Sequence, residues 1–256
     1  MSVMPGAEPY EHDGGDAVGV LLCHGFTGTP QSMRPWGEYL AGQDITVRCP
    51  LLPGHGTRWQ DMNATGWRDW YGALEPVLDE LLDRCRSVFV FGLSMGGTLT
   101  LRLAEDYGAR IAGLVLVNPS VTTLRKDAKL LPLLARIVPA MPGIASDIKK
   151  PDTAELAYGR LPVRAAASLS QLWGLVRRDL GQVEQPLLLL RSSVDHVVEP
   201  VNARIVLDGV RSKDVREMVL PNSYHVATLD NDAQTIFDVS VEFVRRVHDE
   251  RTRQTV

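Results

Sequence analysis

Short apolar runs alternate with helix-prone stretches along most of this chain, and this alternation narrows the folds available to it more than any other feature. The apolar runs, each predicted to be a strand, are Val18–Cys23, Ile45–Cys49, Val88–Phe91, Gly113–Asn118, Leu187–Leu190 and Val215–Leu220. Several are apolar throughout, which is typical of strands covered on both faces. The predicted helices are Ser32–Ala41, Trp67–Cys85, Thr98–Tyr107, Val201–Leu207 and Asp232–His248. This order predicts an α/β fold with right-handed crossovers and a mainly parallel central sheet flanked by helices.

One long interval interrupts the alternation. Between Pro119 and Val183 the sequence shows no convincing strand, only Leu- and Ala-rich helical pieces separated by prolines. A long excursion between two core strands of a compact domain is usually functional. We therefore predict a helical cap at residues 119–183 above a core formed by residues 1–118 and 184–256. A run of ordinary surface helices is the alternative.

Size and composition describe an ordinary globular protein. The 256 residues suit one large α/β domain with an inserted part, and the net charge of −4 provides no basic surface for nucleic acid or an anionic membrane. Three cysteines without a C-x-x-C pair predict neither a disulfide framework nor a zinc site. The polar stretch Met1–Asp16 lacks an apolar signal core, and no apolar run is long enough to span a membrane, so we expect a cytoplasmic protein.

The segment Gly92-Leu-Ser-Met-Gly96 fits the pattern Gly-x-Ser-x-Gly between a predicted strand and a predicted helix. A sharp strand-to-helix turn at a serine exposes its hydroxyl, and small flanking residues permit that turn. The N-terminus of the helix that follows leaves N–H groups free to face a reacting group. The bare pattern is common by chance, but in this setting it predicts that Ser94 is a nucleophile.

A serine hydroxyl needs a neighbouring base, and in turns of this kind an acid and then a histidine follow the serine along the chain. Three histidines follow Ser94, namely His196, His225 and His248. His225 is the candidate base, because it lies in the loop after the last predicted strand. A histidine with a purely structural role in that loop is the alternative.

The acid that orients the base should follow a strand between the serine and the histidine. Asp195 is the first acid after the strand Leu187–Leu190 and is the candidate. Glu199, in the same loop, stays open as the second choice.

The tetrahedral intermediate of an acyl transfer needs N–H donors for its oxyanion. The residue after the nucleophile supplies one, here Met95 N–H. The second is expected from the glycine-containing loop His24–Gly28, where Phe26 N–H is the candidate donor. No cofactor and no metal are required by this chemistry.

With these residues assembled, the chain resembles an α/β-hydrolase, and in particular the bacterial monoacylglycerol lipase and carboxylesterase group. The segments that carry the resemblance are His24–Pro30, Leu52–Thr57, Gly92–Thr98, Asp195–Val198 and Asn222–Asp230. They extend over residues 24–230 in the order found in that family. The resemblance implies the same nucleophile, base and oxyanion donors, and it favours Asp195 over Glu199 as the acid.

The resemblance implies a cofactor-free serine hydrolase that cleaves carboxylic esters of fatty acids, monoacylglycerols in the first place, through an acyl-enzyme on Ser94. A general short- or medium-chain carboxylesterase is the alternative, and a thioesterase or carbon–carbon bond hydrolase is a more distant one. Dehalogenases and epoxide hydrolases of similar fold place an aspartate where this chain has Ser94. We expect the rate to fall as the pH drops through about 6.5, where His225 becomes protonated.

Parts of the predicted cap are candidates for contact with the small lipid ester substrate. The apolar run Leu130–Met141 is suited to line an acyl-chain tunnel, to touch a lipid aggregate transiently, or simply to pack the cap onto the core. Ile144 has the same alternatives. Glu155, predicted on a short helix and facing inward, would accept hydrogen bonds from a glycerol hydroxyl, whereas most helical glutamates are solvated surface groups. The sequence leaves both a monomer and a dimer open.

Overall fold

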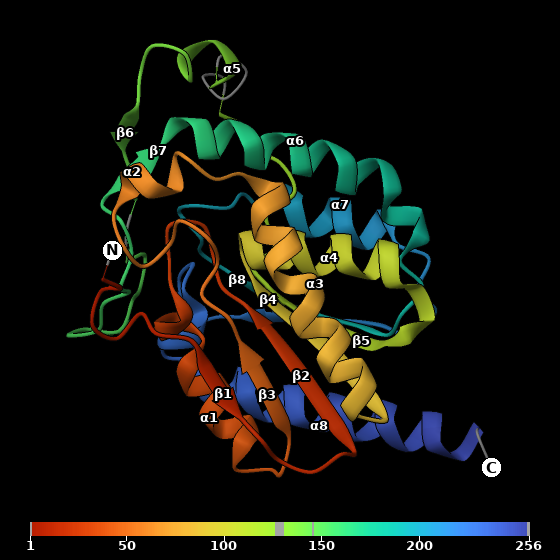
Figure 1. The fold of residues 1–256 in the computed structure, drawn as a ribbon. Helices are drawn as coiled ribbons and strands as arrows, with labels where there is room; N and C mark the ends of the chain where they lie inside the picture. Colours follow the sequence, from red (N-terminus) through yellow and green to blue (C-terminus); the bar gives the residue numbers. More distant parts are fainter. Residues whose placement is uncertain (1, 126–130, 145, 255–256) are drawn as a thin grey trace.

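The computed structural model describes residues 2–125, 131–144 and 146–254 and has a mainly parallel sheet at its centre (Figure 1). The strands run across the sheet in the order β1-β3-β2-β4-β5-β8-β9. Their bounds are Tyr10–His12 (β1), Val18–Cys23 (β2), Thr46–Cys49 (β3), Ser87–Leu93 (β4), Ile111–Val117 (β5), Leu187–Ser192 (β8) and Val215–Leu220 (β9). All neighbours are parallel except β1 and β3. The predicted α/β fold with a mostly parallel sheet is confirmed.

Helices cover both faces of the sheet, as expected for strands that are buried throughout. The α-helices of this core are Arg34–Ala41 (α1), Trp59–Met62 (α2), Trp67–Arg84 (α3), Met95–Tyr107 (α4), Val201–Gly209 (α7) and Ala233–Gln254 (α8), with 3₁₀ turns at Pro30–Ser32, Gly108–Arg110, Leu180–Gln182 and Ala227–Leu229. Side chains of alternate residues in β4 point to opposite faces of the sheet. Phe91 packs against Trp36 of α1 and Phe89 against Phe243 of α8, whereas Val90 belongs to the cluster on the other face, with Trp70 of α3. Figure 1 shows α3 and α4 on one side of the sheet and α1 and α8 on the other.

The segment between β5 and β8 leaves the sheet and returns to it (Figure 1, green to teal). It contains Leu131–Leu134 (α5), Ala140–Pro142 (β6), Arg160–Pro162 (β7) and Val163–Asp179 (α6). The expectation of no strand in this interval is wrong, because β6 and β7 pair in an antiparallel ribbon with Met141 opposite Leu161. Strands this short give no readable alternation, and prolines at the ends of both resemble loop signals.

Helix α6 connects this segment to the core, because its buried side chains share one apolar cluster with those of α4, the helix that follows Ser94. Leu130, the first residue of the predicted apolar run, lies outside the described residues. The role of residues 119–183 as a cap stays a prediction. Within the described ranges, no helix combines the length and the apolar character needed to cross a bilayer.

Candidate active site

Ser94 lies between the last residue of β4 and the first residue of α4, in a backbone conformation that few side chains tolerate. Its φ is 56°, in the left-handed region. Its N–H donates to Val117 O at 3.0 Å and its carbonyl accepts from Ser120 N–H at 3.2 Å, so the end of β5 and the residues after it hold the turn on both sides. The backbone therefore fixes the serine at the carboxyl edge of the sheet.

The glycines of the motif are required by close contacts. A Cβ atom at Gly96 would lie 1.9 Å from Cys23 O, and one at Gly92 would lie 2.3 Å from Gly96 O. Both contacts are with backbone, which cannot move aside as a side chain can. The pattern Gly-x-Ser-x-Gly thus records how closely α4 approaches β2 behind the serine.

His225 and Asp195 come together from two loops at the same edge. Asp195, in the loop after β8, accepts a hydrogen bond from His225 Nδ1 through Oδ2 at 2.8 Å, and the two side chains are only 6% and 8% exposed. Burial alone would lower the pKa of His225, but the charge and the hydrogen bond of Asp195 outweigh it, so the pKa lies above 6.5. With Nδ1–H donated to the carboxylate, Nε2 is left as the basic nitrogen.

The second oxygen of Asp195 is held by backbone. Its Oδ1 accepts N–H bonds from Val197 and Val198, both at 2.8 Å. Burial raises the pKa of Asp195, but His225 and these two N–H groups more than reverse that effect and lower it. The other candidate, Glu199, points elsewhere and accepts from Leu124 N–H at 2.9 Å. The geometry therefore pairs His225 with Asp195 and not with Glu199.

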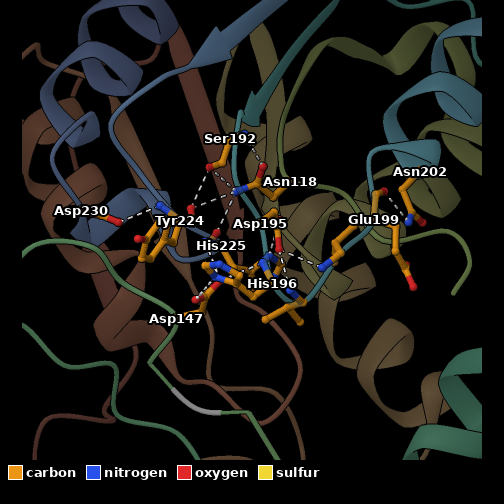
Figure 2. A network of polar contacts seen from close by, with 12 residues as sticks. Asn118, Asp147, Ser192, Asp195, His196, Glu199, Asn202, Tyr224, His225 and Asp230 are labelled. Atoms are coloured by element: carbon orange, nitrogen blue, oxygen red, sulfur yellow. Dashed lines mark hydrogen bonds and ion pairs between the residues drawn. The ribbon is translucent and has the colours of Figure 1, made fainter. Parts of the chain in front are cut away.

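A side chain that the sequence did not single out orients the loop of His225. Asn118, at the end of β5, donates through Nδ2 to His225 O at 2.8 Å and accepts Ser192 N–H at 2.7 Å (Figure 2). Ser192 Oγ in turn donates to Tyr224 O at 2.7 Å. Residues at the ends of β5 and β8 thus both form hydrogen bonds with the loop that carries His225, called the base loop below. A polar residue directly after an apolar strand was the only signal in the sequence for this role.

Two carboxylates on the other side of the base loop join it to the segment 119–183. Asp230, 2% exposed, accepts Tyr224 N–H through Oδ2 at 2.8 Å, and it also accepts Lys149 N–H and Lys150 N–H at 2.7 and 2.8 Å. Asp147, within that segment, accepts the N–H of His225 at 3.2 Å. Neither residue was predicted, because no local sequence pattern indicates that a carboxylate will bond to a loop far away in the chain.

The loop that carries Phe26 is braced by a neutral histidine. His24 is fully buried, and Nε2 accepts Leu52 N–H at 3.2 Å, so Nδ1 carries the proton and faces Gly25 O at 3.0 Å. Burial lowers the pKa of His24 to about 4, which keeps it uncharged at neutral pH. His55 packs edge-on against His24 and braces its own loop through Nδ1 and Pro53 O at 3.1 Å.

Met95 directly follows Ser94, and Phe26 lies in the loop after β2. Met95 is the first residue of α4, so its N–H has no carbonyl one turn back within the helix. Phe26 lines the same cavity as Ser94 and His225. Their role as oxyanion donors stays a prediction.

A cavity of about 310 Å³ opens beside these groups. Ser94, Asp195 and His225 form part of its wall. Much of the remaining wall is apolar and comes from the segment 119–183, with Leu131, Leu134, Met141, Leu161, Leu169 and Trp173. Ile144 also lines it and is 56% exposed, which places this side chain at the mouth. The volume lies at the lower end of the range of about 300–1,000 Å³ that is usual for small-molecule sites.

Glu155 faces this cavity, but it does not lie on a helix as predicted. It belongs to an extended stretch before β7, where its N–H donates to Ser146 Oγ at 2.7 Å. A turn at 151–152 precedes it, and residues 153–158 adopt no regular structure. Its carboxyl lies against the loop of Phe26, since a Cβ at Gly28 would come within 2.6 Å of Oε1. Burial raises the pKa of Glu155 to about 7, against a lowering by His225.

The described residues contain no group of three or more His, Cys, Asp or Glu side chains arranged to hold a metal ion. The reactive groups at this site are the serine hydroxyl, the imidazole and the carboxylates. A serine hydroxyl and a carboxylate-oriented imidazole on the wall of one largely apolar cavity are parts that acyl transfer needs.

Known proteins share these features along nearly the whole chain. The chain is 42% identical over 248 residues to the thermostable monoacylglycerol lipase of Bacillus sp. (strain H-257), which covers 94% of this chain and 95% of the relative. It is 26% identical over 243 residues to a carboxylesterase of Bacillus subtilis (strain 168), covering 94% and 97%.

Solved structures agree with this picture. A solved structure from work on LipS and LipT, two metagenome-derived lipolytic enzymes, matches this chain with a TM-score of 0.93 at 40% identity. The match covers 96% of this chain and 100% of that one. A monoacylglycerol lipase from Paleococcus ferrophilus has the same fold, with a TM-score of 0.80 at 21% identity over 96% and 100% of the two chains. A family model described as serine aminopeptidase, S33, matches residues 17–232. The chain therefore belongs to the family described as serine aminopeptidase, S33, and it has the α/β-hydrolase fold.

Proposed function

We propose that this protein is a serine hydrolase that cleaves monoacylglycerols to glycerol and fatty acid. The observation that carries the proposal is the hydrogen-bonded pair His225 and Asp195, which shares one largely apolar cavity with the strained Ser94. The identity of 42% to a relative named as a monoacylglycerol lipase supports the choice of substrate. The cytoplasmic location expected from the sequence stays a prediction.

The chemistry proceeds through an acyl-enzyme. Ser94 Oγ attacks the ester carbonyl while His225 Nε2 takes its proton, and Asp195 stabilises the imidazolium that forms. The N–H groups of Phe26 and Met95 receive the oxyanion. The imidazolium then protonates the departing glycerol oxygen, and an acyl ester on Ser94 remains. Water, deprotonated by His225, releases the fatty acid and restores the serine.

Glu155 gives the cavity a polar group that an apolar pocket otherwise lacks. Its carboxyl shares the cavity with His225 and Ser94, on the side of the oxyanion loop. With a pKa near 7 it both donates and accepts hydrogen bonds close to neutral pH. We propose that it binds a glycerol hydroxyl, while Ile144 and the leucines of the wall contact the acyl chain. A site built to bond a hydroxyl discriminates against esters that lack one.

A general carboxylesterase is the second candidate, and the relation to the carboxylesterase of Bacillus subtilis favours it. The experiment that separates the two is release of fatty acid from a C12 monoacylglycerol and from the methyl and ethyl esters of the same acid. Ser94→Ala is expected to reduce all three rates to background. Glu155→Ala is expected to lower kcat/KM about tenfold for the glyceride relative to the ethyl ester, the effect of one lost hydrogen bond.

The ratio between two substrates cancels any effect of Glu155 on His225 that both share. Equal cleavage of all three esters by the wild type would support the general esterase and remove the role of Glu155. Labelling of Ser94 by a fluorophosphonate without cleavage of any of the three would mean that the substrate class is wrong.

A further inference from the structure

Asp147 touches both loops that carry the proposed acid and base. It lies between β6 and β7, in the segment 119–183, and its Oδ2 accepts the N–H of His225 at 3.2 Å and that of His196 at 3.1 Å. Its Oδ1 accepts from His196 Nδ1 at 2.8 Å, and its own carbonyl accepts Val226 N–H at 3.1 Å. His196 directly follows Asp195, so one side chain joins the acid loop to the base loop (Figure 2).

The carboxylate of Asp147 is placed where its charge acts on the base. Its side chain is 11% exposed, so solvent screens it only in part. The charged groups that act on His225 are Asp195 from the loop after β8, and Glu155 and Asp147 from the segment 119–183. All three are acids, and each favours the protonated imidazole. Asp147 differs from the other two because it accepts a hydrogen bond from the backbone N–H of His225.

We propose that Asp147 is a positioning residue for His225: from outside the Ser94, His225 and Asp195 constellation it fixes the backbone of the base against the acid loop and adds negative charge behind the imidazolium formed during the reaction. This inference rests on the proposed function, in which His225 is the base. The hydrogen bonds that Asp147 accepts through Oδ2 fix the backbone of His225 and therefore the position of its ring. The negative charge of the carboxylate stabilises the imidazolium that forms each time the ring takes a proton from the serine or from water.

An Asp147 that only stabilised the fold would make the same hydrogen bonds. The test must therefore separate the effect of its charge from the effect of its contacts. Asp147→Asn keeps an oxygen for the two N–H groups and turns its NH₂ toward His196 Nδ1, which accepts in its other tautomer. Only the charge is then lost. Asp147→Ala removes both the charge and the contacts. Asp152→Asn, at an exposed turn of the same segment, removes one negative charge from a side chain outside this set of contacts and is the matched control.

The measurement is the rate of Ser94 labelling by a fluorophosphonate between pH 5 and pH 9, together with kcat and KM on a soluble ester. For Asp147→Asn the acid limb is expected to move to lower pH, because the imidazolium loses a stabilising charge. For Asp147→Ala the limb is expected to move in the same direction and kcat to fall about ten- to a hundredfold with little change in KM, as for a misplaced catalytic group. Asp152→Asn is expected to match the wild type.

An acid limb that coincides in the wild type, Asp147→Asn and Asp152→Asn overturns the inference even if stability falls, because the loss of a residue that only stabilises the fold lowers stability without moving the limb. Thermal unfolding of each variant shows whether it is folded, and the near-isosteric Asn variant keeps the test decisive if the Ala variant is not. A wild type that is neither labelled nor active refutes the proposed function itself. A labelled, active wild type with unmoved limbs refutes only the role of Asp147.

Discussion

The base His225 lies among acids, and this determines the pH range in which the proposed reaction runs. Burial lowers the pKa of His225, while Asp195, and then Glu155 and Asp147, raise it above 6.5. The imidazole must be neutral to accept the serine proton, so kcat/KM falls as the pH drops through this raised pKa. The midpoint of the acid limb is thus expected above the value of about 6.5 that the sequence alone suggests.

A pH profile of kcat/KM on a soluble ester tests this expectation. Asp195→Asn serves as the companion variant and is expected to lower kcat about 10⁴-fold, the loss typical when the orienting carboxylate becomes an amide. A profile that stays flat from pH 5 to pH 8 would refute His225 as the base.

The sequence predicted those residues of the site that belong to a local pattern. Ser94 is marked by its glycines, and His225 and Asp195 by their places after particular strands, although Asp195 was preferred over Glu199 only through a family resemblance. Asp147 and Asn118 escaped prediction. Their bonds to His225 join residues that are 78 and 107 positions apart in the chain, and only the fold brings them together.

At the scale of elements, Asp230 joins the segment 119–183 to the base loop. It accepts four backbone N–H groups, from Lys149, Lys150, Tyr224 and Asn231, at 2.7–2.8 Å. Asp230→Ala leaves these donors without their acceptor in a site that is 2% exposed. We expect the free energy of unfolding to fall by about 3 kcal/mol, several times the cost of one lost hydrogen bond.

Urea unfolding of Asp230→Ala and of the exposed control Asp152→Asn checks this value, because Asn tolerates the left-handed backbone of Asp152 at φ 56°. The control is expected within about 0.5 kcal/mol of the wild type. A free energy for Asp230→Ala within that same margin would contradict the role assigned to the carboxylate.

Long elements were predicted well and short ones poorly, for a physical reason. Strands β2, β4 and β5 are buried throughout, so their apolar runs are visible in the sequence. The ribbon of β6 and β7 has three residues per strand, too few to show a period. Helix α4 begins at Met95, earlier than predicted at Thr98, because two glycines in its first turn weaken the helix signal.

At the scale of the whole molecule, Glu105 makes global stability depend on pH. Its side chain on α4 is fully buried, with Oε2 bonded to Arg102 at 3.0 Å and Oε1 without a hydrogen-bond partner. Burial raises the pKa of Glu105 from 4.5 to about 8, which exceeds the opposing effect of Arg102. The folded state therefore holds the proton more tightly than the unfolded chain. Its contribution to stability is complete below pH 4.5 and is lost as the pH rises through about 8.

Glu105→Gln cannot ionise and so isolates this contribution. In urea unfolding at pH 5, 6.5 and 8.5, the wild type is expected to lose stability relative to the variant as the pH rises. The same difference in free energy at all three values would show that Glu105 carries no unusual proton.

The connections between the segment 119–183 and the sheet have a consequence for how such proteins diversify. Val121 and Thr122, near its start, donate their N–H groups to Asn202, both at 2.7 Å. Its middle part meets the loop of His225, where Asp147 accepts His225 N–H and Asp230 accepts Lys149 N–H. A segment exchanged alone between relatives would leave buried acceptors on one side and unmatched donors on the other. We therefore expect an exchange of residues 119–183 to succeed only where the incoming segment also offers partners to Asn202, to Asp230 and to the loop of His225.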